Sequence, residues 1–334
     1  MSGNPSPTQE AEEALKRWGI PHEKREDGTI FVPGDLDISN KGLKSLPGLG
    51  MVEVQGVFDC SNNQLTALKG APRKTGGTFN CAYNCIESLA GAPAEVGGDF
   101  RCNSNELDNL EGGPSKVAGD YDCNSNRLTT LKGAPAVVAG NFNCSMNILS
   151  NIADGPSKVG RNYDCQNNSL QTLKGAPAEV PSYFNCGNNR LASLEGGPRK
   201  VGYSYYCGNN KLLTLKGAAD EVGQHFNCSS NMLASLEHGP AKVGENYYCD
   251  NNKLQTLKGA PEEIGGIFHC LQNDGVVSLH LAPKRFQKLE CDVGVFNAYE
   301  DIPSYLRMPE EATAGAAELK TSLKVPRLLK IRMP

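Results

Sequence analysis

The sequence predicts an all-β solenoid, and a regular spacing of cysteines is the main observation behind that prediction. Of the 13 cysteines, twelve follow one another at intervals of 21 residues from Cys60 to Cys291, and only Cys85 is out of phase. Each cysteine from Cys60 to Cys270 has an aromatic residue two positions before it and an asparagine three positions after it. A fixed period in this range indicates a stack of similar turns, each of which is one short supersecondary unit.

The segment before the repeats predicts a helix from Ser6 to Gly19. It has a serine or threonine cap, glutamates in its first half, a basic pair near its end and a glycine stop. Together with Trp18 and Ile20, this helix should cover the first turn, because a solenoid needs a cap over its open end. Residues 1–35 are therefore assigned to an N-terminal helical cap.

Residues 36–291 are assigned to the solenoid, in which each turn contributes one short strand with inward aromatic and cysteine side chains. Cysteine then serves as a small apolar residue, so this column should be buried and reduced, and Cys85 alone should react quickly. The asparagine after each strand can bond backbone groups of neighbouring turns and so form a ladder. We expect Asn168, in the middle of this ladder, to matter more for stability than Asn273 at its frayed end.

A Gly-Ala-Pro or Gly-Gly-Pro corner completes each turn, because glycine permits a positive φ and proline fixes an extended return. Asp154 and His238 replace the first glycine, and we expect the glycine after each of them to relieve the turn. The return arm, for example Ala94 to Gly98, is too short and too rich in glycine for a helix. The convex side should therefore be extended or polyproline-like.

A double repeat of 42 residues is superimposed on the single one. The aromatic residue alternates between Phe and Tyr from Phe100 to Phe268, and the corner residue before proline alternates between Ala and Gly. Charge alternates as well, as at Lys216, Glu237 and Lys258. Because stacked turns lie about 5 Å apart, this alternation should place opposite charges beside each other and help to set the register.

The pattern decays after Asn273, and residues 292–334 are assigned to a C-terminal cap and a basic tail. Pro309 to Lys320 predicts a short helix. The segment from Leu319 to Pro334 carries five basic residues and no acidic one. It is interpreted either as a solvated end or as a docking segment for an acidic partner surface.

The repeat unit resembles that of the leucine-rich-repeat proteins. Aromatic-x-Cys-x-x-Asn-x-Leu matches the strand and asparagine of that family, with cysteine in one of its aliphatic positions, over about Leu36 to Cys291. The repeat length is most similar to the short repeats of bacterial effectors and of uncharacterised tailed-bacteriophage proteins. The resemblance implies a curved stack of parallel strands with a concave face.

Composition excludes several classes of partner. The formal net charge is −4 with both signs mixed, so there is no basic field that would hold a nucleic acid. No apolar run approaches the roughly 18 residues of a membrane span. The N-terminal residues lack the apolar core of a secretion signal, which favours cytoplasmic synthesis without export.

No residue pattern points to catalysis, a metal or a cofactor. Cysteines 21 residues apart supply one thiol per turn rather than converging ligands, and none of the five histidines forms a recognisable motif. Some bacterial leucine-rich effectors carry a ligase domain, but only 43 residues follow Cys291. The sequence therefore predicts a protein that is not an enzyme.

The strand positions that flank the inward aromatic residue should face the concave side and supply the binding surface. The candidate contact residues are Tyr183, Tyr206, His225 and Tyr248. The candidate residues for electrostatic steering of a basic region of the partner are Asp99, Asp120, Asp122 and Asp164. Exposed tyrosines are typical of binding surfaces because they bury much area at a modest entropic cost.

These observations predict a non-catalytic protein-interaction or structural protein, with a protein partner and a place in a larger assembly. The resemblance suggests a phage structural or accessory protein associated with the virion. One alternative is a carbohydrate or host-surface binding module, which Tyr206 and Tyr248 among asparagines would favour. Another is a secreted bacterial effector that recruits a host protein.

Overall fold

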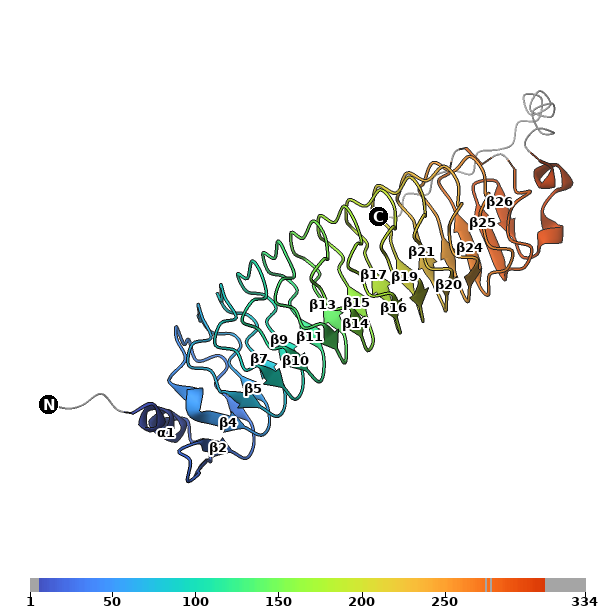
Figure 1. Cartoon of the computed structure of the whole chain (residues 1–334). Helices are drawn as coiled ribbons and strands as arrows, with labels where there is room; N and C mark the ends of the chain where they lie inside the picture. The colour runs from blue at the N-terminus through green and yellow to red at the C-terminus, as the bar shows by residue number, and fades with distance from the viewer. Residues whose placement is uncertain (1–5, 274, 277, 310–334) are drawn as a thin grey trace, which may run out of the picture.

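The computed structural model describes residues 6–309 of the chain, except 274 and 277, as a stack of about twelve β turns. Figure 1 shows an elongated body in which each turn lies against the next, with helix α1 (Pro7–Arg17) at one end and strand β26 (Gly294–Phe296) near the other. The predicted all-β solenoid with a helical N-terminal cap is confirmed. Residues 310–334, which include most of the predicted C-terminal helix and the whole basic tail, lie outside the description.

Helix α1 begins at a capping box, in which two side chains satisfy the first free N–H groups. The Ser6 Oγ accepts a hydrogen bond from the Gln9 N–H at 3.3 Å, and the Gln9 Oε1 accepts one from the Ser6 N–H at 2.8 Å. Leu15 is fully buried, and Trp18 and Ile20 pack against the same core. The helix thus covers the apolar end of the first turn.

One strand from each turn enters a 14-stranded sheet that is parallel up to its last strand. Phe58 pairs with Phe79 and Phe79 with Phe100, so each residue lies beside its equivalent 21 positions later. Strand β26 alone is antiparallel. The other strands are β3 (Leu36–Asp37), β5 (Phe58–Asp59), β7 (Phe79–Asn80), β9 (Phe100–Arg101), β11 (Tyr121–Asp122), β13 (Phe142–Asn143), β15 (Tyr163–Asp164), β17 (Phe184–Asn185), β19 (Tyr205–Tyr206), β21 (Phe226–Asn227), β23 (Tyr247–Tyr248), β24 (Ile267–Cys270) and β25 (Lys288–Cys291).

The return arms form short strands too, so the convex side is extended and hydrogen-bonded, and the polyproline-like alternative is wrong. Each arm lies close enough to the next for backbone bonds: the Gly202 N–H donates to the Val180 carbonyl at 3.0 Å. An eight-stranded sheet contains β1 (Glu23–Lys24), β2 (Ile30–Val32), β4 (Val52–Val54), β6 (Lys74–Thr75), β8 (Glu95–Val96), β10 (Lys116–Val117), β12 (Val137–Val138) and β14 (Lys158–Val159). A four-stranded sheet contains β16 (Glu179–Val180), β18 (Lys200–Val201), β20 (Glu221–Val222) and β22 (Lys242–Val243).

Pro181 explains why the convex side is divided into two sheets. In the next turn the equivalent residue is Gly202, whose N–H makes the bond to Val180 given above. Proline has no N–H, so the corresponding bond from position 181 to the Val159 carbonyl cannot form. The 14-stranded sheet passes through the same turn without interruption.

Three short 3-10 segments complete the described residues. They are η1 (Leu49–Met51), η2 (Tyr299–Asp301) and η3 (Ser304–Arg307). Ile302, which follows η2, and Leu306, in η3, are buried in the same core as the stack. The C-terminal end of the core is therefore covered, as α1 covers the N-terminal end.

The core consists of columns of equivalent side chains that run the length of the stack. The aromatic rings from Phe58 to Phe268 follow one another at centroid distances between 5.0 and 5.8 Å. The twelve cysteines in phase are all buried, and Cys85 is exposed. The predicted position of the cysteine column is confirmed.

The asparagine ladder joins each turn to the one before it. The Asn168 Nδ2 donates to the carbonyl of Cys165 in its own turn at 3.2 Å and to that of Cys144 in the preceding turn at 3.0 Å. Its Oδ1 accepts from the N–H of Leu149, also in the preceding turn, at 3.0 Å. Equivalent amide-to-carbonyl bonds recur from Asn63 to Asn273, so the predicted ladder is confirmed.

The expectation that Asn273 lies at a frayed end is wrong. Only 1% of this residue is exposed, and its Nδ2 makes the usual bonds to the carbonyls of Cys249 and Cys270 at 3.1 Å. Its own N–H donates to the Asp292 Oδ2 at 2.7 Å. The turn that follows therefore closes over this end although the repeat motif is no longer recognisable there.

The alternation of Phe with Tyr and of Ala with Gly is one size-matching relation. A Cβ on Gly197 would lie 2.9 Å from the Tyr205 hydroxyl, whereas the equivalent alanines, such as Ala176 before Phe184, face a ring without that oxygen. Each tyrosine thus requires glycine eight positions earlier. The hydroxyl groups of these tyrosines are buried, and none has a hydrogen-bond partner among the described residues. They belong to Tyr121, Tyr163, Tyr205 and Tyr247.

The same relation corrects our interpretation of the two irregular corners. Asp154 and His238 themselves adopt a φ of 65°, a conformation that Asp and His tolerate better than most residues do. Gly155 does not take over the positive φ. It is required instead for space, because a Cβ there would lie 2.9 Å from the Tyr163 hydroxyl.

Ion pairs between neighbouring turns confirm the predicted role of the charge alternation. Lys216 contacts Glu195 at 2.7 Å, and Lys258 contacts Glu237 at 2.8 Å. These side chains are largely exposed, so each pair contributes little to stability. Their main effect is that like charges do not face each other along a column.

We predict that Asn168→Ala and Asn273→Ala destabilise the protein by similar amounts, about 1–3 kcal/mol each, because both leave buried carbonyls without a donor. Equilibrium denaturation of the two variants measures this. A negligible loss at Asn273 beside a large loss at Asn168 would contradict the closed C-terminal end.

The size-matching relation predicts a double-mutant cycle. Gly197→Ala should cost about 1–3 kcal/mol because the new methyl group overlaps the Tyr205 hydroxyl. In a Tyr205→Phe background the same change should cost much less, which gives a favourable coupling energy. Additive effects of the two substitutions in denaturant melts would show that the alternation has another cause.

Candidate functional site

Two positions in each turn point outward from the 14-stranded sheet and define its outer face. Position A is the residue before the buried aromatic ring, and position B is the residue after it. Most of these residues are Asn, Asp or Ser. Their hydrogen bonds show which of them serve the fold and which do not.

Position A forms a second ladder along the stack. The Asp99 Oδ1 accepts from the Asp120 N–H at 3.0 Å, 21 residues later, and the Asn162 Oδ1 accepts from the Tyr183 N–H at 3.1 Å. The same bond is made by the side chains of Thr78, Asp120, Asn141, Ser204, His225 and Asn246. Between Thr78 and Asn246, Tyr183 alone supplies no such acceptor.

Position B closes a local turn in which the side chain accepts the N–H two residues later. In the turn after Asn185, for example, Asn185 Oδ1 accepts from the Gly187 N–H at 3.1 Å. The residues that do this are Asp59, Asn80, Asp122, Asn143, Asp164, Asn185 and Asn227. Between Asp59 and His269, the position B residues that lack this bond are Arg101, Tyr206, Tyr248 and His269.

In the C-terminal half, the residues that replace Asn, Asp or Ser at positions A and B by a ring lie together in one feature, which we call the aromatic stripe. It consists of one ring from each of five consecutive turns: Tyr183, Tyr206, His225, Tyr248 and His269. The Tyr183 and Tyr206 rings meet edge to face at a centroid distance of 6.4 Å. The Tyr248 and His269 rings stack at 5.0 Å, with His225 6.3 Å from Tyr248.

All four aromatic residues predicted from the sequence thus lie on one face, and the structure adds His269. The sequence does contain a signal for His269, because it interrupts the run of Asn and Asp at position B. Its importance is not evident until the hydrogen bonds of that position are known. A residue that neither bonds the backbone nor fills the core is available for a ligand.

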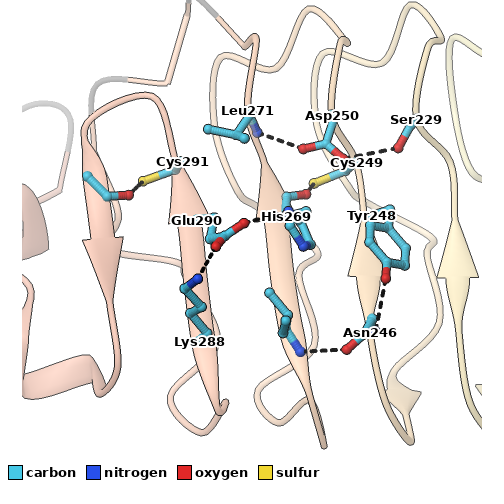
Figure 2. Close-up of polar contacts among 12 residues, drawn as sticks. Ser229, Asn246, Tyr248, Cys249, Asp250, His269, Leu271, Lys288, Glu290 and Cys291 are labelled. Atoms are coloured by element: carbon cyan, nitrogen blue, oxygen red, sulfur yellow. Dashed lines mark hydrogen bonds and ion pairs between the residues drawn. The ribbon is translucent and has the colours of Figure 1, made fainter. Parts of the chain in front are cut away.

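Polar neighbours hold the rings at the C-terminal end of the stripe, as Figure 2 shows. The His269 Nδ1 lies 3.0 Å from the Glu290 Oε2, and Lys288 pairs with the same carboxylate. The hydrogen bond from Lys288 holds the pKa of Glu290 below its usual value, although burial acts in the opposite direction. The Asn246 Nδ2 donates to the Tyr248 hydroxyl at 2.9 Å.

The four predicted aspartates lie on the same outer face but serve the backbone as well. Asp99 and Asp120 are rungs of the ladder at position A, and Asp99 also pairs with Arg101 at 2.8 Å. Asp122 and Asp164 close turns at position B, and burial raises the pKa of both carboxyls. Asparagine closes the same turn elsewhere without placing a charge there, so the carboxylates are not required by the fold.

Asp164 connects the acidic residues with the stripe. Burial, and next the Asp164 carboxylate, raise the pKa of Tyr183 above its usual value. Asp99, Asp120 and Asp122 lie in turns further toward the N-terminus. The sequence-predicted set is therefore not one compact cluster but an acidic region followed by an aromatic one.

The described residues contain no group of three or more His, Cys, Asp or Glu side chains that could hold a metal ion. Among the same residues, no helix is long and apolar enough to cross a membrane. The outer face carries rings, amides and carboxylates, and these groups can bind a partner by stacking and hydrogen bonding.

Comparison with known proteins gives one partial structural likeness. No protein-family model matches the sequence, and no curated protein matches it. Among solved structures, YopM from Yersinia enterocolitica WA-314 is similar, with a TM-score of 0.48 and 18% sequence identity over 79% of this chain and 62% of that one. This chain therefore spans less than two thirds of the YopM chain. The description of the fold as a leucine-rich-repeat-type solenoid rests on the strand register and the asparagine ladder given above.

The hydrogen bonds at position B predict that Tyr206 is dispensable for folding. Tyr206→Asn should change the free energy of unfolding by less than about 1 kcal/mol, because the new amide can close the turn that tyrosine leaves open. The matched change Asn185→Ala should cost about 1 kcal/mol, since it removes that bond. Denaturant melts compare the two, and a larger loss for Tyr206→Asn would assign Tyr206 to the fold.

Proposed function

We propose that the protein is a non-catalytic binding protein whose partner, a segment of another protein, lies along the aromatic stripe. The observation that carries this proposal is one ring in each of five consecutive turns, of which Tyr183, Tyr206 and Tyr248 stand where neighbouring turns carry a side chain that bonds the backbone. At these three tyrosine positions the fold would be served at least as well by Asn or Ser. The rings therefore cost the fold hydrogen bonds, which supports a role outside it.

The dimensions of the stripe suit an extended peptide. Neighbouring strands are about 4.8 Å apart, so five turns span about 19 Å, the length of roughly six extended residues. Tyrosine rings bury a large area with few rotatable bonds, and Asn185 and Asn227 lie between them as hydrogen-bonding groups. Tyrosine together with asparagine is typical of binding surfaces such as antibody loops.

The acidic region would raise the rate at which the partner associates. Asp99, Asp120, Asp122 and Asp164 place carboxylates on the face next to the stripe, and complementary charge raises association rates more than it prolongs residence. A partner with a basic segment beside its bound residues fits this arrangement. Neutralising these aspartates should then lower the association rate and its dependence on salt.

A carbohydrate is the second candidate for the same surface, because Tyr206 and Tyr248 lie two turns apart with amides beside them. A basic tail acting as the docking segment is the competing protein-binding hypothesis. Virion association, a bacterial effector role and cytoplasmic synthesis stay predictions. Genomic neighbours would distinguish a phage accessory protein from an effector.

The test uses substitutions that the repeat itself supplies. A displayed library of random peptides is screened for binding to the full chain. The affinity of the peptides that bind is then measured by titration with three variants. The triple variant Tyr183→Asn, Tyr206→Asn and Tyr248→Asn should weaken binding at least about tenfold, an effect of roughly 1.4 kcal/mol, while its melting curve stays cooperative. Deletion of residues 319–334 should leave binding unchanged.

As a control on the same face, Asn143→Asp alters position B outside the stripe and should bind as the parent chain does. Equal affinity of the parent chain and the triple variant would refute the role of the stripe. Loss of binding only on deletion of the tail would show that the solenoid acts as a spacer. Selection of glycans rather than peptides by the stripe would favour the carbohydrate alternative.

A further inference from the structure

A second feature of the outer face lies in the N-terminal half, separate from the aromatic stripe. It is a hollow of about 390 Å³ between consecutive turns, lined by residues that include Asn62, Asn80, Tyr83, Arg101, Asn103 and Asp122. Its volume is at the lower end of the range of small-molecule pockets. Three turns separate Asp122 from Tyr183, so the two features do not share a ring.

Tyr83 is the first residue of the hollow that the fold does not explain. Its φ is 55°, and 58% of the residue is exposed. Equivalent turn positions are mostly occupied by Asn and Ser, for example Asn62 and Ser104. A bulky side chain at positive φ is costly, and an exposed ring recovers none of that cost through burial.

Arg101 is the second unexplained residue. It stands at position B, where the neighbouring turns carry Asn80 and Asp122 and close the local turn with their side chains. Its guanidinium pairs with Asp99 at 2.8 Å, and about half of the side chain is exposed. The substitution therefore gives up a backbone bond and places a planar set of N–H donors at the hollow.

Acceptors complete the lining. Asp122 uses its Oδ1 to close the turn at Asn124, and its Oδ2 accepts no hydrogen bond within the described chain. The side-chain carbonyl oxygens of Asn62 and Asn103 are likewise unused there, since only their Nδ2 groups donate, to neighbouring serines. One ring face, one donor group and several acceptors thus border the same space.

We propose that this hollow binds a neutral saccharide unit. The Tyr83 ring would lie against the apolar face of the sugar, Arg101 would donate to its ring or hydroxyl oxygens, and Asp122 and Asn103 would accept from its hydroxyl groups. Positive and negative side chains are both present, since Arg101, which pairs with Asp99, borders the same hollow as Asp120 and Asp122. An anionic ligand would meet the carboxylates and a cationic one the guanidinium, so an uncharged ligand with many hydroxyls fits best.

The repeat supplies conservative variants for the test. Tyr83→Ser installs the residue found at Ser104 and Ser125, and Arg101→Asn installs the residue found at Asn80 and Asn143. Both should fold at least as well as the parent chain because each restores the usual residue of its position. Met146→Ser is the matched control, since Met146 has the same φ of 55° and the same exposure of 58% but lies outside the hollow.

The experiment probes the purified full chain against an array of neutral oligosaccharides and titrates the strongest of them by calorimetry. The parent chain and Met146→Ser should bind equally, while Tyr83→Ser and Arg101→Asn should each bind at least tenfold more weakly. Tyr83 and Arg101 lie outside the aromatic stripe, so loss of binding in these two variants separates this site from the stripe, and either proposal can fail without the other.

Three results would overturn the proposal. The first is the absence of binding to any neutral oligosaccharide on the array. The second is binding that Tyr83→Ser and Arg101→Asn leave unchanged. The third is binding restricted to acidic glycans, or to basic peptides tested in parallel, because the charge argument would then be wrong.

Discussion

The side-chain amide that follows each strand is the interaction on which the rest of the structure depends. By bonding carbonyl groups of its own turn and of the preceding one, as Asn168 does with Cys165 and Cys144, it fixes every turn in the same register. Each buried residue then lies beside its own equivalent, about 5 Å away. Aromatic, thiol and aliphatic side chains tolerate such columns, whereas charges and oversized groups do not. Two patterns follow from this constraint: Lys alternates with Glu, and the pair of Tyr with Gly alternates with the pair of Phe with Ala.

The same constraint gives meaning to the outer face. A backbone held in register needs partners for its N–H groups, and Asn, Asp and Ser at positions A and B supply them. A residue at such a position that does not accept this bond removes a hydrogen bond from the fold. Tyr183, Tyr206 and Tyr248 do this in one region, and Arg101 does it in another. Departures from the repeat, rather than the repeat itself, therefore identify the surfaces proposed for binding.

The sequence predicts the period, the inward columns, the asparagine ladder, the helical cap and four residues of the stripe, because each of these depends on spacing alone. It does not predict features that depend on what a side chain meets across turns. Asn273 lies under a closing turn that has lost the motif, and Gly155 provides space for a hydroxyl rather than a positive φ. The dual use of Asp122 and the hollow beside Tyr83 likewise become visible only when neighbouring turns are placed together. Pro181 divides one sheet for a reason that a single repeat does not contain.

The central claim is that one register runs through the whole stack, and counting reactive thiols tests it most directly. Burial raises the pKa of Cys102 and Cys144 well above the usual value and also excludes reagents, so the column should be unreactive in the native state. With a thiol reagent and no denaturant, one group per chain should react at once, and mass spectrometry should place it at Cys85. The eleven cysteines from Cys60 to Cys270 should then react together as the protein unfolds. Rapid labelling of several of these cysteines in the native protein would contradict a continuous, in-register stack.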